Sequence, residues 1–75
     1  MIIKSMDEIS RRYARGTLRA FLEGKQNLKW VLRVIESSGV RGRRLSEVFE
    51  GLKGYGNYER YREALSECRD QGWLD

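Results

Sequence analysis

Three closely spaced arginines, Arg41, Arg43 and Arg44, form the strongest candidate binding site in this sequence. They come directly before apolar positions at helical spacing, which predict a short helix over residues 43–52. The first turn of a helix presents free backbone amides and a partial positive charge, so arginines at this place favour a phosphate group. The alternative is a basic turn that is only solvated.

A second group of arginines follows helical spacing near the N-terminus. Arg11, Arg15 and Arg19 recur every four residues, and Arg12 lies beside them. Like charges at this spacing destabilise an isolated helix slightly. The stripe is therefore either a solvated helix face or a surface that attracts an anion.

Catalysis and metal binding have little support in this composition. The chain has no histidine, which removes the commonest general base and the commonest neutral metal ligand. Its single cysteine, Cys68, cannot form an internal disulfide, and we expect it to be a buried apolar residue in a reducing compartment. We therefore predict that the protein is not an enzyme and uses no cofactor and no metal ion.

Length and hydropathy indicate one cytoplasmic domain. A chain of 75 residues has room for a single core, so we predict one domain over residues 1–75. The apolar start is interrupted at Lys4 and is too short for a signal sequence. No apolar run reaches the length that spans a membrane, and we expect no membrane partner.

The net charge of +4 is unevenly distributed along the chain. Residues 1–33 carry eight basic and three acidic side chains, residues 34–54 carry four and three, and residues 55–75 carry three and five. Arginine accounts for most of the basic residues, and its planar guanidinium binds phosphate or carboxylate in a bidentate manner. The basic N-terminal part thus favours an anionic partner of either chemistry.

Apolar periodicity and glycine positions predict an all-α domain of four helices. We expect helices over residues 6–22, from 28 to 37 or 38, over 43–52, and from 58 to a point just before Gly72. Ser5, Asn27 and Asn57 would be N-terminal caps and Gly72 a C-terminal cap. Residues 5–23 would form an additional basic amphipathic helix, and residues 27–75 a three-helix core centred on residues 28–38. The last residues, 73–75, would be an abbreviated strand or a packed tail.

Each predicted helix has an apolar face that we expect to be buried. In the first helix this face consists of Met6, Ile9, Tyr13, Thr17, Ala20 and Phe21. In the last it consists of Tyr58, Tyr61, Ala64, Leu65 and Cys68. We expect Ile35 and Leu65 to be core residues, and Trp30 to lie in the core, under the first helix, or at a dimer interface.

The segment from Asn27 to Asp75 resembles the helix-turn-helix core of winged-helix DNA-binding domains. The similarity rests on a helix ending "IESSG", the short helix "RRLSEVF", a glycine-containing turn and the final "NYERYREALSEC". It implies that Arg43, Arg44 and Ser46 contact the DNA backbone. It also implies that Asn57, Tyr58, Arg60 and Arg62 enter the major groove. The chain ends at Asp75, so we expect the wing to be missing and the additional helix to replace it.

Acidic residues on the last helix depart from this pattern. Glu59, Glu63, Glu67 and Asp70 lie opposite its apolar face, where they would repel phosphates. Three explanations remain open. The acids could pair with arginines on the same helix, only the tip from Asn57 to Arg62 could enter the groove, or the acidic face could bind the arginine stripe of a second subunit.

These features predict a small DNA-binding protein that acts in transcriptional regulation or on chromatin. DNA contacts would come from the three-arginine turn, the first-helix stripe of Arg11, Arg15 and Arg19, and the last helix. A homodimer on two half-sites is a further expectation. The alternative function is a protein-interaction module that uses the same scaffold and the acidic face of the last helix.

Overall fold

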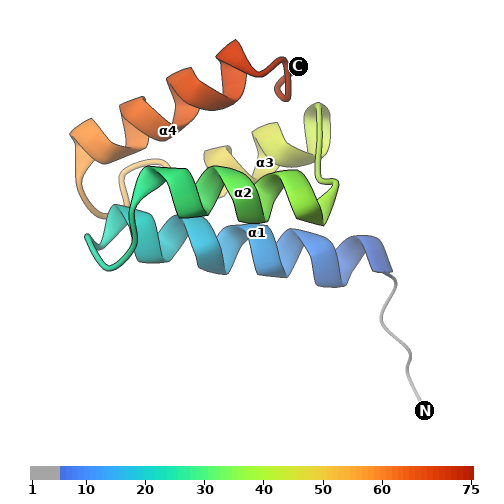
Figure 1. The fold of residues 1–75 in the computed structure, drawn as a ribbon, viewed down its shortest axis with the longest axis horizontal. Coiled ribbons are helices and arrows are strands. Elements are labelled where there is room, and N and C mark those ends of the chain that lie inside the picture. The colour runs from blue at the N-terminus through green and yellow to red at the C-terminus, as the bar shows by residue number, and fades with distance from the viewer. Residues whose placement is uncertain (1–5) are drawn as a thin grey trace.

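A computed structural model describes residues 6–75, which form four helices and no named strand, as the sequence predicts. The helices are α1 (Met6–Leu22), α2 (Leu28–Ser38), α3 (Arg43–Gly51) and α4 (Tyr58–Asp70). Figure 1 shows that α1 and α2 run in opposite directions along the long axis, with α4 on the other side of the molecule from α1. The all-α prediction is confirmed, and the third helix ends one residue earlier than expected.

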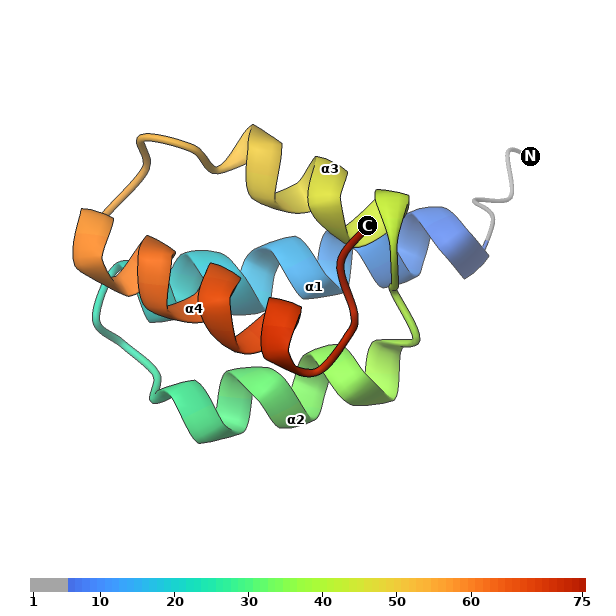
Figure 2. The same cartoon turned by 90° about the horizontal axis from the view of Figure 1, so that it is seen from above.

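The central helix of the fold is α1. It makes the principal contacts with each of α2, α3 and α4. Seen from above, α4 lies over α1, and α2 and α3 lie on its two sides (Figure 2). The prediction that residues 28–38 occupy the centre was wrong. The N-terminal helix is therefore the element on which the other three pack.

The buried face of α1 is rotated from the face that its sequence pattern indicates. Ala14 and Leu18 are fully buried, whereas Met6, Ile9 and Tyr13 are 75%, 47% and 59% exposed. Thr17 and Phe21 are buried as predicted, and the Thr17 hydroxyl donates to the Tyr13 carbonyl at 3.0 Å. The core is completed by Leu22, Val31, Ile35, Val40, Leu45, Val48, Phe49, Leu52, Ala64 and Cys68.

Three further side chains were expected in the core and are at least partly exposed. Trp30 is 39% exposed, so it is not a core tryptophan. Tyr58 is 67% exposed, and Leu65 is only partly buried. Ile35 is fully buried, which confirms its core position. The amphipathic pattern identified the helices correctly but did not always identify the face that packs.

Helix ends follow the caps expected from the sequence. The side chains of Asn27 and Asn57 accept hydrogen bonds from the amides of Trp30 and Arg60 at 2.9 and 3.1 Å. Gly72 follows α4 with a φ of 77°, a conformation that favours glycine. The capping role predicted for Ser5 lies outside the described residues.

The connection between α3 and α4 is anchored to the end of α1. The Asn57 amide donates to the Leu22 carbonyl at 3.0 Å. Gly56 precedes it with a φ of 66°, and a Cβ at this position would lie 2.7 Å from the Leu22 carbonyl oxygen. Only glycine fits this close approach, which fixes where α4 begins relative to α1.

The tail after α4 packs against the start of α3. The Gly42 amide donates to the Trp73 carbonyl at 2.6 Å, and Gly42 and Leu74 form an isolated parallel bridge. The Trp73 amide donates to the Cys68 carbonyl at 3.0 Å. The tail thus combines the two forms predicted for residues 73–75, since it is packed and makes one bridge.

Truncating the two predicted core residues should have unequal effects. Ile35→Ala leaves a cavity in a fully buried site and should cost about 2–5 kcal/mol of unfolding free energy. Leu65→Ala should cost less, on the order of 1 kcal/mol, because Leu65 keeps contact with solvent. Urea unfolding of both variants measures the difference. Equal losses would contradict the packing of α4 described here.

Candidate nucleic-acid interface

Arg41 holds the end of α2 instead of facing solvent. Its guanidinium donates to the carbonyls of Ile35 at 3.1 Å, Val40 at 2.9 Å and Glu36 at 3.1 Å. The same group stacks on the Trp73 ring, 4.4 Å from the ring centroid. These contacts satisfy carbonyl groups at the end of a helix and fix the C-terminal tail. Arg41 therefore has few donors left for a phosphate.

Arg44 and Arg43 differ in their contacts within the protein and in their exposure to solvent. Arg44 forms an ion pair with Asp7 of α1 and donates to the Gly39 carbonyl at 3.1 Å. Arg43 lies within 3.5 Å of Glu47, and its side chain is 84% exposed. The three arginines therefore do not form one phosphate site, because Arg41 and Arg44 bind groups within the protein and only Arg43 projects into solvent.

The first-helix stripe is divided in a similar way. Arg11 pairs with Asp7 at 3.2 Å and with Glu47 of α3 at 2.8 Å, so it links α1 to α3. Arg15 is exposed and, within residues 6–75, forms no ion pair.

Arg19 belongs to a small polar network at the end of α1. Its guanidinium lies 5.1 Å from the centroid of the Tyr55 ring, and the Tyr55 hydroxyl donates to Glu23. The hydrogen bond from Tyr55, together with Lys25, lowers the pKa of Glu23. Contact with the Tyr55 hydroxyl raises the pKa of Arg19. The network fixes the α3–α4 connection on α1. Arg19 therefore has a partner within the protein and is less free to bind an anion.

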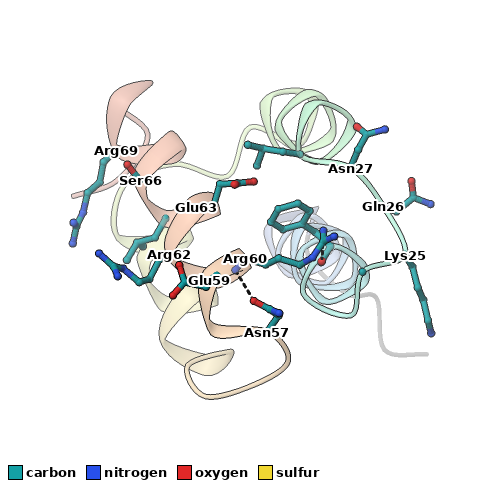
Figure 3. A pocket seen from close by; sticks show the side chains of 14 residues that line it. Lys25, Gln26, Asn27, Asn57, Glu59, Arg60, Arg62, Glu63, Ser66 and Arg69 are labelled. Carbon is teal, nitrogen blue, oxygen red and sulfur yellow. Dashed lines mark hydrogen bonds between the residues drawn. The ribbon is translucent and has the colours of Figure 1, made fainter.

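Two of the residues expected in the major groove hold the start of α4 in place. The Asn57 side chain caps the helix, as the dashed line in Figure 3 marks. Arg60 turns back toward α1, where it lies 5.0 Å from the Phe21 ring centroid and donates to the Phe21 carbonyl at 3.3 Å. Both side chains therefore have a structural partner within the chain.

The side of α4 that carries Arg62 and Arg69, called its basic side, differs from the side that carries Glu63, called its acidic side. Glu59 lies beside Arg62 (Figure 3). Figure 3 shows Arg62 and Arg69 on the side of α4 away from α2, and Glu63 on the side toward α2. Tyr58 is exposed and lies near Arg62, whose guanidinium is 5.9 Å from the tyrosine ring centroid. In the described part of the chain, Arg62 and Arg69 form no ion pair.

The basic side of α4 faces a groove that it shares with α3. This groove has a volume of about 450 Å³. Its polar and aromatic lining includes Ser46, Glu50, Lys53, Tyr58, Arg62, Arg69 and Asp75. Ser46, Tyr58 and Arg62 were predicted from the sequence, whereas Lys53 and Arg69 were not. Arg69 follows Arg62 by two helical turns, and this spacing is the signal that could have identified it.

The acidic side of α4 faces a wider and more open groove. That groove has a volume of about 1120 Å³ and lies between α4 and the α1–α2 connection. Glu59 and Glu63 line it together with Lys25, Arg60, Arg62 and Arg69, so its charge is mixed and the two arginines Arg62 and Arg69 border both grooves. Across residues 6–75, Glu59, Glu63, Glu67 and Asp70 form no ion pair. Pairing within α4, one of the explanations for these acids, is therefore absent.

Nucleophilic chemistry has no support at the cysteine. Burial raises the pKa of the Cys68 thiol to about 12, so it stays protonated at neutral pH. The described residues also contain no cluster of acidic, cysteine or histidine side chains that could hold a metal ion. The polar groups on the surface are suited to binding charged partners.

Comparisons with protein-family models, curated proteins and solved structures give no match for this chain. None of the helices in residues 6–75 combines the length and hydropathy of a membrane-spanning segment. The candidate site therefore rests on the geometry of the α3–α4 groove.

Arg41 and Arg43 should differ sharply when each is replaced by glutamine. Arg41→Gln removes hydrogen bonds to three carbonyls and should cost about 1.5–3 kcal/mol of unfolding free energy. Arg43→Gln is the matched control, because it removes the same charge from an exposed side chain and should change stability by less than about 0.5 kcal/mol. Urea unfolding measures both values. Equal stability of the two variants would contradict the structural role of Arg41.

Proposed function

We propose that this protein binds double-stranded DNA through the α3–α4 surface, defined by Ser46, Lys53, Tyr58, Arg62 and Arg69. The observation that carries the proposal is that Arg62 and Arg69 lie on one side of α4 and form no ion pair within residues 6–75. Glu63 projects on the other side (Figure 3). Arg62 and Arg69 can approach phosphates while Glu63 stays turned toward α2.

Each residue type on this surface suits a duplex. The guanidinium group of arginine can donate two parallel hydrogen bonds to a phosphate, and the lysine ammonium group adds a positive charge. Hydroxyl groups such as those of Ser46 and Tyr58 are common donors to the DNA backbone. Glu50 and Asp75 also line the groove and would repel a phosphate, so a phosphate would have to approach on the side of Arg62 and Tyr58.

The proposal retains the helix-turn-helix arrangement suggested by the sequence. In it α4 is the helix that enters the major groove, and α3 lies against the backbone. Arg43 is the member of the three-arginine turn with an exposed guanidinium to reach a phosphate, and Arg15 is exposed on α1. Such a protein would act in transcriptional regulation or on chromatin, where a homodimer would read two half-sites.

A second candidate function uses the acidic side of α4. Glu59, Glu63 and Asp70 are exposed, and none forms an ion pair within residues 6–75. Unpaired acids on one helix face favour a basic partner protein, or the exposed arginines on α1 of a second copy. Replacing acids on this face should weaken that association and leave DNA binding unchanged or slightly stronger.

Charge removal from the α3–α4 surface should weaken DNA binding specifically. The double variant Arg62→Gln with Arg69→Gln loses two phosphate contacts, so the slope of log affinity against log salt should become shallower by about 2. Fluorescence anisotropy with a generic duplex over a salt series measures this slope.

The control removes the same charge from α2. Lys29 and Arg33 are exposed there, and Figure 2 shows α2 on the opposite side of α4 from α3. Lys29→Gln with Arg33→Gln should keep the wild-type slope. An equal loss in both double variants would mean that net charge alone governs binding. Absence of binding at low salt would refute the DNA proposal and favour the acidic interaction surface.

A further inference from the structure

An apolar hollow lies on the outer edge where α1 and α2 meet. It has a volume of about 410 Å³ and is lined by Ile9, Arg12, Tyr13, Gly16, Thr17 and Trp30. The large apolar side chains around it are substantially exposed, at 47% for Ile9, 59% for Tyr13 and 39% for Trp30. The hollow is separate from the α3–α4 surface, since α2 and α3 lie on opposite sides of α4 (Figure 2).

Within residues 6–75, most of the large exposed hydrophobic residues lie at or near this edge. Five large hydrophobic side chains are exposed in the described residues, and Tyr58 is the one that lies away from α1 and α2. Met6, at 75% exposure, is on the same helix as Ile9 and Tyr13. Single exposed hydrophobics are ordinary on a protein surface, but a gathered set around a hollow is typical of an interaction site.

Gly16 gives the hollow its depth. It lies in the middle of α1, where glycine is less favourable than any residue except proline. Its φ is not positive, and a Cβ added there would have no neighbour within 4 Å. Neither backbone conformation nor packing within the protein therefore requires glycine. Any larger residue would project into the hollow, so glycine keeps it open.

The charge beside the hollow indicates what can occupy it. Arg12 lines the hollow, and Arg15 is exposed nearby on α1. In residues 6–75 neither arginine forms an ion pair. A partner with acidic groups would complement these guanidinium groups.

Two other occupants fit less well. A symmetric dimer across this edge would bring Arg12 of one copy toward Arg12 of the other, which is repulsive. A lipid surface would rest on the rim and leave the hollow unfilled. A protruding side chain of a partner protein would fill it, as happens when a helix binds in a groove.

We propose that the α1–α2 hollow is a docking site for an amphipathic helix of a partner protein. A large apolar side chain of that helix enters the space above Gly16, between Tyr13 and Trp30. Aspartate or glutamate residues beside the apolar face of that helix pair with Arg12 and Arg15. This site involves none of the residues that define the α3–α4 surface, and Arg15 is the one residue that it shares with the wider DNA-binding proposal.

A peptide selection tests both the shape and the charge of the occupant. The probe is a displayed library of helical peptides with leucines at i, i+3, i+4 and i+7 and random residues at the flanking positions. Selection on the wild-type protein, with removal of clones that bind Gly16→Leu, should enrich aspartate and glutamate at the flanks. Enrichment of lysine or arginine, or no clone that distinguishes the two proteins, would overturn the proposal.

Affinity measurements on an enriched peptide use three variants. Gly16→Leu should weaken binding by at least about tenfold, because its side chain fills the hollow. Gly51→Leu is the matched control, since Gly51 is also helical with no neighbour within 4 Å of an added Cβ, and it should bind as the wild type does. Arg12→Gln should weaken binding about two- to fivefold at low salt and not at high salt.

Fold and occupant controls complete the experiment. Gly16→Ala should raise the Tm by about 4–8 °C, which would show that the glycine is not needed for the fold. A Tm lowered by both substitutions at Gly16 would contradict the inference. Sedimentation of the wild type, and its binding to vesicles of phosphatidylglycerol and phosphatidylcholine, test the other occupants. A dimer or vesicle binding that Gly16→Leu abolishes would replace the partner helix with a second copy or a membrane.

Discussion

Burial of one face of α1 is the constraint on which the rest of this structure depends. Ala14 and Leu18 are fully excluded from solvent, and α2, α3 and α4 each make their principal contacts with this helix. The connection to α4 is also fixed there, through the Leu22 carbonyl. Because the three other helices share one partner, disturbing α1 would separate them all, whereas a change on an outer face remains local.

The same packing decides which arginines remain available for binding. Arg11 and Arg44 both link α1 to α3, and Arg41 satisfies carbonyls at the end of α2. These three arginines are therefore engaged within the domain and are less free to contact a partner. The net charge of +4 therefore overstates the basic surface, and the proposed DNA contacts depend on a few side chains without internal partners.

Local sequence signals predicted the positions of the helices well. They did not predict which face of each helix is buried or which arginines have partners, because these depend on packing between distant segments. Asn27 and Asn57 cap helices because a side-chain oxygen needs only an amide three residues away. The choice between the faces of Tyr13 and Ala14, about 100° apart on α1, depends on which one the other helices cover. The structural role of Arg41 could not be predicted from the sequence either, since its acceptors are backbone carbonyls that a turn brings close to it. Lys53 and Arg69 became site candidates only when α3 and α4 were seen to enclose a groove.

Rotation of α1 into its packed position explains why the two proposed surfaces lie apart. Once Ala14 and Leu18 face inward, Ile9 and Tyr13 must face outward beside Trp30, and this exposure creates the apolar hollow. The basic residues of the α3–α4 surface lie beyond α4 on the other side, as Figure 2 shows for the helices that carry them. A helix docked above Gly16 would leave Arg62 uncovered. Under the two proposals, one small domain can hold a duplex and a partner protein at the same time.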